Sequence, residues 1–185
     1  MQRKDGFTLI ESMVALAVLS ILATLAIPAF HATFQAARVR GAADAIVDLV
    51  AEARQGAVKI AREVSVASGG EGAQWCIGAR EAPMPVAGAQ SGAAAACDCL
   101  ARSEECVVAG ERRTVVGARF GGVAVTAASP HPLGFDGRIG MRIDAGRMDV
   151  FQVASGRHLL SVSVSPLGHA SVCSLSGHVS GVPAC

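Results

Sequence analysis

The sequence predicts an α+β fold in which one long N-terminal α-helix packs on an antiparallel β-sheet domain. The first observation is a segment of 18 residues without charge, from Met13 to Phe30. The second is that apolar residues after Phe30 recur at three- and four-residue spacing, which is typical of an amphipathic helix. The third is that short β-type runs broken by glycine and proline begin at Glu63. No helical pattern separates these runs, so the sheets should be antiparallel.

Composition narrows the functions that the chain can have. Of its 185 residues, 51% are hydrophobic and 17% are charged, and the mean hydropathy is +0.44. An ordinary soluble domain carries about 25% charged residues. The net charge of +1 excludes a broadly basic nucleic-acid coat and an acidic tail. The absence of tyrosine and the single tryptophan exclude an aromatic-rich surface for single-stranded nucleic acid or sugars.

The N-terminal apolar segment is long enough for a membrane helix. Eighteen residues are near the lower limit for crossing a bilayer, and extension back to Phe7 adds Glu11 as the only ionisable group. Arg3 and Lys4 precede it, which favours a cytoplasmic N-terminus. The segment is too long for a cleaved secretory signal. A plain membrane anchor leaves Glu11 unexplained, because a central carboxylate costs on the order of 2.5–3.5 kcal/mol.

The N-terminal motif accounts for this carboxylate through a family resemblance. The string Gly6-Phe7-Thr8-Leu9-Ile10-Glu11 resembles the class III signal of type IV prepilins and type II secretion pseudopilins. This resemblance implies that a prepilin peptidase cleaves between Gly6 and Phe7 and N-methylates Phe7. It also makes Glu11 the family's glutamate and Pro28 its helix-loosening proline, and it makes other pilins or pseudopilins the partners. No cofactor is implied.

Electrostatics supports the implied role of Glu11 in assembly. After cleavage the new N-terminal amine of Phe7 carries a positive charge near neutral pH. In a helical filament, the Glu11 carboxylate of one subunit can pair with the Phe7 amine of its neighbour. Burial without that partner would be penalised, so the pair favours one axial register.

The segments expected from this type IV pilin-like architecture follow the change in pattern along the chain. They are a leader at residues 1–6, a transmembrane or filament-core helix at 7–30, an amphipathic helical spine at 31–66 and an antiparallel β domain at 67–185. The predicted strands are 64–67, 74–77, 106–109, 113–118, 123–126, 141–144, 148–153, 159–164 and 170–174. The Ala/Gly/Pro-rich residues 78–96 predict a long surface loop.

A helical spine followed by an all-β domain is similar to the minor-subunit branch named GspH/FimT. The residues that carry this resemblance are Trp75-Cys76-Ile77-Gly78, the stretch 134–140 (GFDGRIG) and the terminal cysteine. It implies a minor subunit near the tip of a secretion pseudopilus or type IV pilus that helps to initiate assembly. The expected location is the bacterial inner membrane, single-pass, with the C-terminal domain in the periplasm before incorporation into a periplasmic or extracellular filament.

DNA binding during uptake is the alternative function, because some relatives in this branch bind DNA through an arginine-bearing segment near the C-terminus. The corresponding residues 176–181 have His178 where arginine would be wanted. DNA affinity comes largely from Lys and Arg on phosphates, so this departure disfavours DNA as a partner. Arginines elsewhere could form a patch, for which a solvated strand face is the preferred interpretation: 112, 113 and 119, or 138, 142, 147 and 157.

The cysteines predict disulfides, since all six follow the membrane segment and should lie in an oxidising compartment. They are Cys76, Cys97, Cys99, Cys106, Cys173 and Cys185. We favour Cys173 with Cys185, which ties the C-terminal tail to the last strand. The other four should pair among themselves, but not Cys97 with Cys99. A zinc site on those four is the less favoured alternative, because the paired spacings of structural zinc sites are missing.

Enzymatic chemistry is not expected. No Ser-His-Asp constellation, phosphate loop or metal-site spacing rises above chance, and the five histidines are dispersed. The glycine-rich stretch 134–140 does not link a strand to a helix as a dinucleotide fingerprint must, and we interpret it as a turn between strands. The sequence therefore predicts no catalytic residue and no metal.

Overall fold

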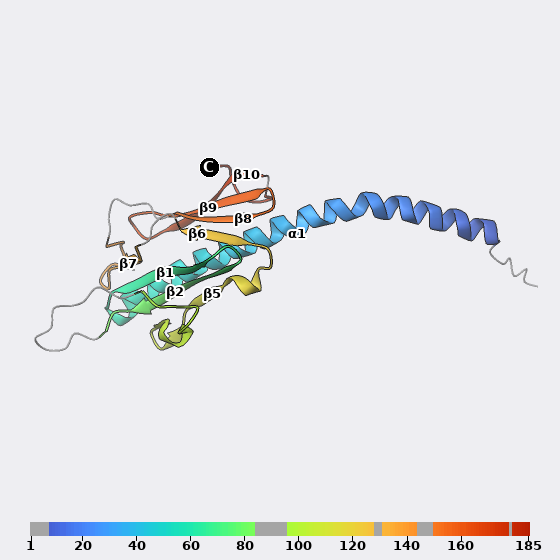
Figure 1. Cartoon of the computed structure of the whole chain (residues 1–185). Helices are drawn as coiled ribbons and strands as arrows, with labels where there is room; N and C mark the ends of the chain where they lie inside the picture. The colour runs from blue at the N-terminus through green and yellow to red at the C-terminus, as the bar shows by residue number, and fades with distance from the viewer. Residues whose placement is uncertain (1–7, 84–95, 128–130, 144–149, 178) are drawn as a thin grey trace, which may run out of the picture. The chain divides into compact units, whose positions relative to one another are not determined.

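One long helix and a set of antiparallel sheets make up the computed structural model, which describes residues 8–83, 96–127, 131–143, 150–177 and 179–185 (Figure 1). The side chains of residues 25–29 and 150 also lie outside the description. The helix α1 spans Leu9–Ile60. The chain divides into two units, Met1–Phe34 and Gln35–Cys185. Helix α1 thus contributes to both units, and the second unit holds its last 26 residues and all the strands.

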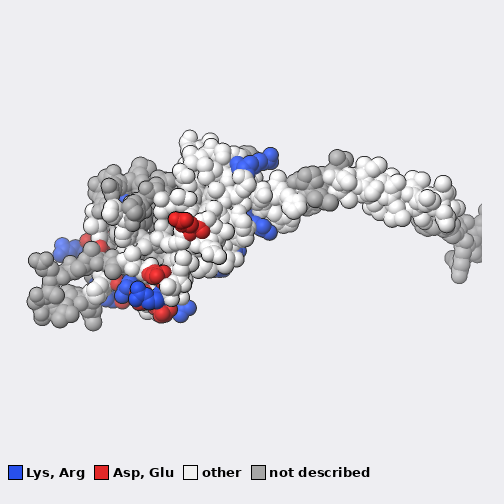
Figure 2. All heavy atoms as spheres, viewed as in Figure 1, with Lys and Arg blue, Asp and Glu red and all other residues white. Residues whose placement is uncertain are grey.

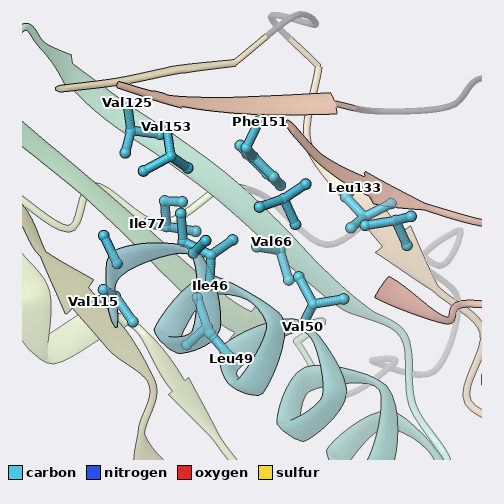
Figure 3. Close-up of a cluster of buried hydrophobic side chains, with 14 of the residues drawn as sticks. Ile46, Leu49, Val50, Val66, Ile77, Val115, Val125, Leu133, Phe151 and Val153 are labelled. Carbon is cyan, nitrogen blue, oxygen red and sulfur yellow. The ribbon is translucent and has the colours of Figure 1, made fainter. Parts of the chain in front are cut away.

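The part of α1 within Gln35–Cys185 buries the apolar stripe that the spacing predicts. Eight of its apolar residues are at most 3% exposed: Val39, Ala42, Ala43, Ile46, Leu49, Val50, Ala53 and Ala57. Figure 3 shows Ile46, Leu49 and Val50 directed from the helix toward side chains of the sheets. Small alanines in this stripe let the strands approach the helix backbone closely. The fold class predicted from the sequence, a helix on antiparallel sheets, is confirmed.

The helix ends at Ile60, six residues before the predicted end of the spine at residue 66. Ala61 adopts a left-handed conformation (φ 53°). The Arg62 N–H donates to the Ala57 carbonyl (3.2 Å) and the Ala61 N–H to the Val58 carbonyl (3.3 Å). These two bonds form a Schellman motif, which satisfies the last carbonyls and stops the helix. The prediction was wrong because the apolar spacing persists through residues that already lead into a strand.

Replacing Ala61 with glycine is expected to stabilise the chain. A left-handed residue with a Cβ costs about 1 kcal/mol that glycine does not. We expect the free energy of unfolding to rise by about 0.5–1 kcal/mol, measured by urea unfolding of the detergent-solubilised full chain. Ala118→Gly, in an exposed turn without positive φ, is the matched control. An Ala61→Gly variant no more stable than that control would contradict the cap assignment.

Two four-stranded sheets and a small hairpin follow the helix, and their strand pairings are antiparallel. The first sheet has the order β5-β2-β1-β7 and the second β10-β9-β8-β6. The strands of the first are β1 (Val64–Glu71), β2 (Gln74–Glu81), β5 (Thr114–Val116) and β7 (Leu133–Phe135). Those of the second are β6 (Ala124–Ala127), β8 (Val150–Ser155), β9 (His158–Val164) and β10 (Ala170–Ser176), and the hairpin joins β3 (Val107–Val108) to β4 (Glu111–Arg112).

Three details of the strand prediction need correction. Residues 141–143 form only an isolated bridge, between Arg142 and Phe135, and Asp144 lies outside the described residues. Strand β7 was not predicted, because its three residues include a glycine and follow a proline. Strand β2 continues through Gly78 to Glu81, so the predicted loop begins later than residue 78, and residues 84–95 of that loop are not described.

Trp75 links the first sheet to the segment that precedes β6. Its side chain is 2% exposed, and its indole N–H donates to the Val123 carbonyl (2.9 Å). Its ring stacks on Phe120, with 6.0 Å between the ring centroids. The buried indole therefore has both an apolar contact and a satisfied donor, as a buried tryptophan requires.

Candidate assembly and processing site

The predicted processing site and the start of α1 lie next to each other in the sequence. Gly6 and Phe7 fall outside the described residues, so the site is described from Thr8 onward. Helix α1 begins at Leu9, and the Glu11 N–H donates to the Thr8 hydroxyl oxygen (3.3 Å). Thr8 is therefore the N-cap and Glu11 the third helical residue, the spacing of a capping box. We did not predict this role for Thr8, although a threonine three residues before a glutamate is the sequence signal for it.

The position of Glu11 suits a negative charge. It lies in the first turn, where the helix dipole favours an anion. Its side chain is exposed, and no ion pair joins its carboxylate to another residue in the described part of the chain. This carboxylate is thus available to a cation from another molecule.

The unit Met1–Phe34 leaves its apolar side chains uncovered. Nine large apolar residues between Leu9 and Leu22 are 50–79% exposed: Leu9, Ile10, Met13, Val14, Leu16, Val18, Leu19, Ile21 and Leu22. The hydroxyls of Ser20 and Thr24 donate to the carbonyls of Ala17 and Ile21, both at 2.8 Å. An exposed apolar surface of this extent marks an interaction site, and here both hydroxyls are already satisfied within the helix.

Two further findings concern this helix. A search of its described residues finds no stretch both long and apolar enough to cross a membrane. The backbone of α1 continues through position 28 without interruption, while the side chain of Pro28 lies outside the description.

All six cysteines form disulfides. The pair that we favoured from the sequence, Cys173 with Cys185, is joined, and the other bonds are Cys76–Cys99 and Cys97–Cys106. Because a zinc site needs thiolates, the four cysteines proposed for that alternative are engaged in a different chemistry. Cys76, Cys97, Cys99 and Cys106 are at most 5% exposed and form a buried cluster of their own.

The bond between Cys173 and Cys185 fastens the C-terminal tail along β10. The Ser174 N–H donates to the Pro183 carbonyl (2.7 Å), and the Cys185 N–H donates to the Ser174 carbonyl (3.2 Å). Ser174 and Ala184 form a parallel bridge. The tail thus covers part of an edge strand that would otherwise present unpaired backbone groups.

The motif Trp75-Cys76-Ile77-Gly78 has a structural explanation. Trp75 and Ile77 belong to the core, and Cys76 forms a disulfide. A Cβ at Gly78 would lie 2.5 Å from the Cys97 sulfur and 2.7 Å from the Cys106 sulfur. Glycine is required there because the second disulfide packs directly on the strand backbone.

The stretch 134–140 turns around the C-terminal end of α1. The Asp136 carboxylate accepts from the N–H groups of Arg138 (2.8 Å) and Ile139 (3.2 Å), and the Gly140 carbonyl accepts from the Arg54 Nε–H (3.0 Å). Phe135 before the turn is fully buried. The prediction of a turn was right for its second half, whereas its first residues belong to β7.

Several arginines considered for a DNA patch are engaged elsewhere. Arg142 is 3% exposed and donates to the Val164 carbonyl (2.9 Å). Arg113 forms ion pairs with Glu52 and Glu111. Arg147 and His178 lie outside the described residues.

Comparison with known proteins agrees with the N-terminal geometry. Residues 1–27 match the family described as the prokaryotic N-terminal methylation motif. This motif, continued by a long N-terminal helix and antiparallel sheets, defines a type IV pilin-like protein.

Two solved structures, both of the type IV minor pilin FimU from Pseudomonas aeruginosa, are similar to the chain. One is 16% identical with a TM-score of 0.48, covering 78% of this chain and 92% of that one. The other is 15% identical with a TM-score of 0.45, covering 72% and 90%. A comparison with curated proteins found no match.

Proposed function

We propose that the chain is a minor pilin or pseudopilin that a prepilin peptidase cleaves after Gly6 and methylates on Phe7. The observation that supports this most directly is the methylation motif over residues 1–27, with Glu11 as the only carboxylate in a helix whose apolar side chains are uncovered. Its role is structural: it packs residues 7–30 against the same helices of other subunits. Before assembly, this segment holds the chain in the inner membrane, with the β domain in the periplasm.

Assembly depends in this proposal on the charge of Glu11. The carboxylate has no ion-pair partner within the described residues, and after cleavage the Phe7 amine of a neighbouring subunit is a matching cation. A buried pair that loses one partner leaves the other charge uncompensated, at a cost of about 3–5 kcal/mol. Pairing therefore favours subunits in the correct axial register.

The test is a set of three variants expressed in the native host. Glu11→Ala should reduce incorporation into filaments at least tenfold, while the leader is still cleaved. Glu11→Gln should be equally defective, because it preserves the capping box but removes the charge. Thr8→Ala, which costs about 1 kcal/mol of helix capping, should still be incorporated. The measurement is immunoblotting of sheared filaments, with cleavage followed by N-terminal sequencing.

The variants also separate charge from capping. Normal incorporation of Glu11→Gln, with failure of Glu11→Ala, would show that hydrogen bonding at the helix start is sufficient. That outcome would overturn the pairing mechanism and leave the pilin assignment intact. Failure of leader cleavage in the unaltered chain would overturn the assignment itself.

We further propose that the subunit acts in initiation at the filament tip. Deletion of the chain should then reduce the number of filaments without shortening those that remain, as counted by electron microscopy. Fewer and shorter filaments in equal measure would indicate a role along the shaft instead.

A further inference from the structure

Four arginines lie around the first turns of α1 within the unit Gln35–Cys185. We define this basic collar as Arg38, Arg40, Arg119 and Arg157, all of which are exposed. Figure 2 shows basic side chains at the end of this unit where its helical segment begins. Three different surface turns contribute to the collar or contact it, so it is a product of the tertiary structure rather than of one basic sequence.

The first two sides of the collar are placed by contacts with α1. The Arg38 guanidinium donates to the Gly121 carbonyl (3.1 Å), which brings the turn containing Arg119 beside the helix. At Gly156, a Cβ would lie 2.5 Å from the Gln35 amide oxygen. The β8–β9 turn that carries Arg157 therefore rests on the helix one turn before Arg38.

The third side is the loop before the C-terminal tail. Arg40 donates to the Ser180 carbonyl, and a Cβ at Gly181 would lie 3.3 Å from the Arg40 guanidinium carbon. The collar thus lies at one level of the helix, between Gln35 and Gly41.

The charges of the collar are incompletely neutralised. Arg40 pairs with Asp44 (3.6 Å). Arg38, Arg119 and Arg157 have no ion-pair partner among the residues that the structure describes. One further carboxylate, Glu71, lies near this end, two residues before Ala73, whose carbonyl approaches the turn at Gly117. Four arginines against two carboxylates leave a surplus of two positive charges.

The opposite end of the unit differs in this respect. Ion pairs there join Arg62 to Glu81 (2.7 Å) and Arg80 to Glu105 (3.0 Å). Arg102 also pairs with Glu105 (2.8 Å). The uncompensated positive charge of the collar is therefore a property of one end of the unit, not of its whole surface.

The sequence places this charge directly after the apolar segment. No Lys, Arg, Asp or Glu occurs between Glu11 and Arg38, and Arg38 follows Phe30 by eight residues. We infer that the basic collar docks on anionic phospholipid headgroups while the chain is held in the membrane before assembly. This inference rests on the proposed membrane-held state. Basic residues near an anionic membrane surface gain attraction that falls off within a Debye length.

Phospholipid fits the collar better than duplex DNA does. The arginines surround the base of an apolar helix at one level, which matches a plane of headgroups beside a hydrocarbon layer. A DNA-binding surface would instead follow the phosphates with an extended row of Lys and Arg.

The test uses the full chain in lipid nanodiscs and hydrogen exchange by mass spectrometry. One set of nanodiscs is purely phosphatidylcholine, and the other contains one-third phosphatidylglycerol. Amides in residues 117–123 and 155–158 should exchange at least threefold more slowly in the anionic discs at low salt. The difference should disappear at high salt, because exposed charges are then screened.

Two double variants decide whether the collar is responsible. Arg119→Gln/Arg157→Gln should abolish the lipid-dependent protection, since each arginine near an anionic surface shifts the equilibrium about fivefold. Arg112→Gln/Arg138→Gln removes the same charge from two other exposed arginines and should leave the protection unchanged. Equal loss in both variants would overturn the collar in favour of net charge.

The remaining outcomes separate this inference from the proposed function. Failure of the chain to enter either type of nanodisc would contradict the membrane-held state itself. Entry into both, with equal exchange in both, would overturn lipid docking alone. Protection of the same amides by duplex DNA, without protection by anionic lipid, would also overturn it and support the nucleic-acid alternative.

Discussion

Replacing Gly137 with alanine is expected to lower the free energy of unfolding by about 2–3 kcal/mol, the range typical of overpacking. A Cβ at this position would lie 2.6 Å from the Ala61 carbonyl carbon and 2.8 Å from that of Arg62. Both are backbone atoms at the end of α1, so neither can move aside as a flexible side chain would. The measurement is urea unfolding of the detergent-solubilised full chain, followed by the fluorescence of Trp75, the single tryptophan.

Gly121→Ala is the matched control for this substitution. No atom lies within 4 Å of a Cβ at Gly121, and its φ is not in the left-handed region. The same chemical change should therefore alter stability by less than about 0.5 kcal/mol. Equal stability of the two variants would show that the turn at Gly137 does not pack on the helix end as closely as the structure indicates.

Removal of the Cys76–Cys99 disulfide is expected to cost about 3 kcal/mol. The two cysteines are 23 residues apart, and closing a loop of this length restricts the unfolded chain by roughly that amount. The double variant Cys76→Ala/Cys99→Ala also leaves space in a buried cluster, because Cys76 is 0% exposed and Cys99 is 4% exposed. Unfolding under non-reducing conditions measures the loss.

Cys173→Ala/Cys185→Ala provides the comparison. Its loop of 12 residues gives a chain-entropy term only about 0.5 kcal/mol smaller, but Cys173 is only partly buried and Cys185 is exposed. We expect the first variant to be the less stable of the two, by the contribution of packing. The opposite order would show that the C-terminal tail contributes more to stability than the cysteine cluster beneath β2.

The long-range features of the fold were accessible from the sequence where one periodicity extended over many residues. The apolar stripe from Val39 to Ala57 repeats over five helical turns, so its buried face was predictable. Short elements were less accessible. Strand β7 is held by pairing with Val64–Val66 of β1, a partner about 70 residues earlier, and nothing in three residues of sequence specifies that pairing.

The candidate site shows the same division. The motif from Gly6 to Glu11 is contiguous, and its match to the methylation family follows from local sequence alone. The helix end was missed because its stop signal is alanine at a left-handed position rather than the usual glycine. The basic collar was also missed, because its arginines come from distant parts of the sequence.

The sequence by itself determined the class of protein: a methylation motif, a carboxylate alone in an apolar segment, a helix followed by antiparallel strands, and cysteines suited to disulfides. These properties depend on residue type and short-range spacing. Only the tertiary structure decided which of the inner four cysteines pair, why Gly78 and Gly137 must lack a side chain, and where uncompensated positive charge collects. Those outcomes depend on distances between residues far apart in the chain, and such distances arise only when the helix and sheets pack together.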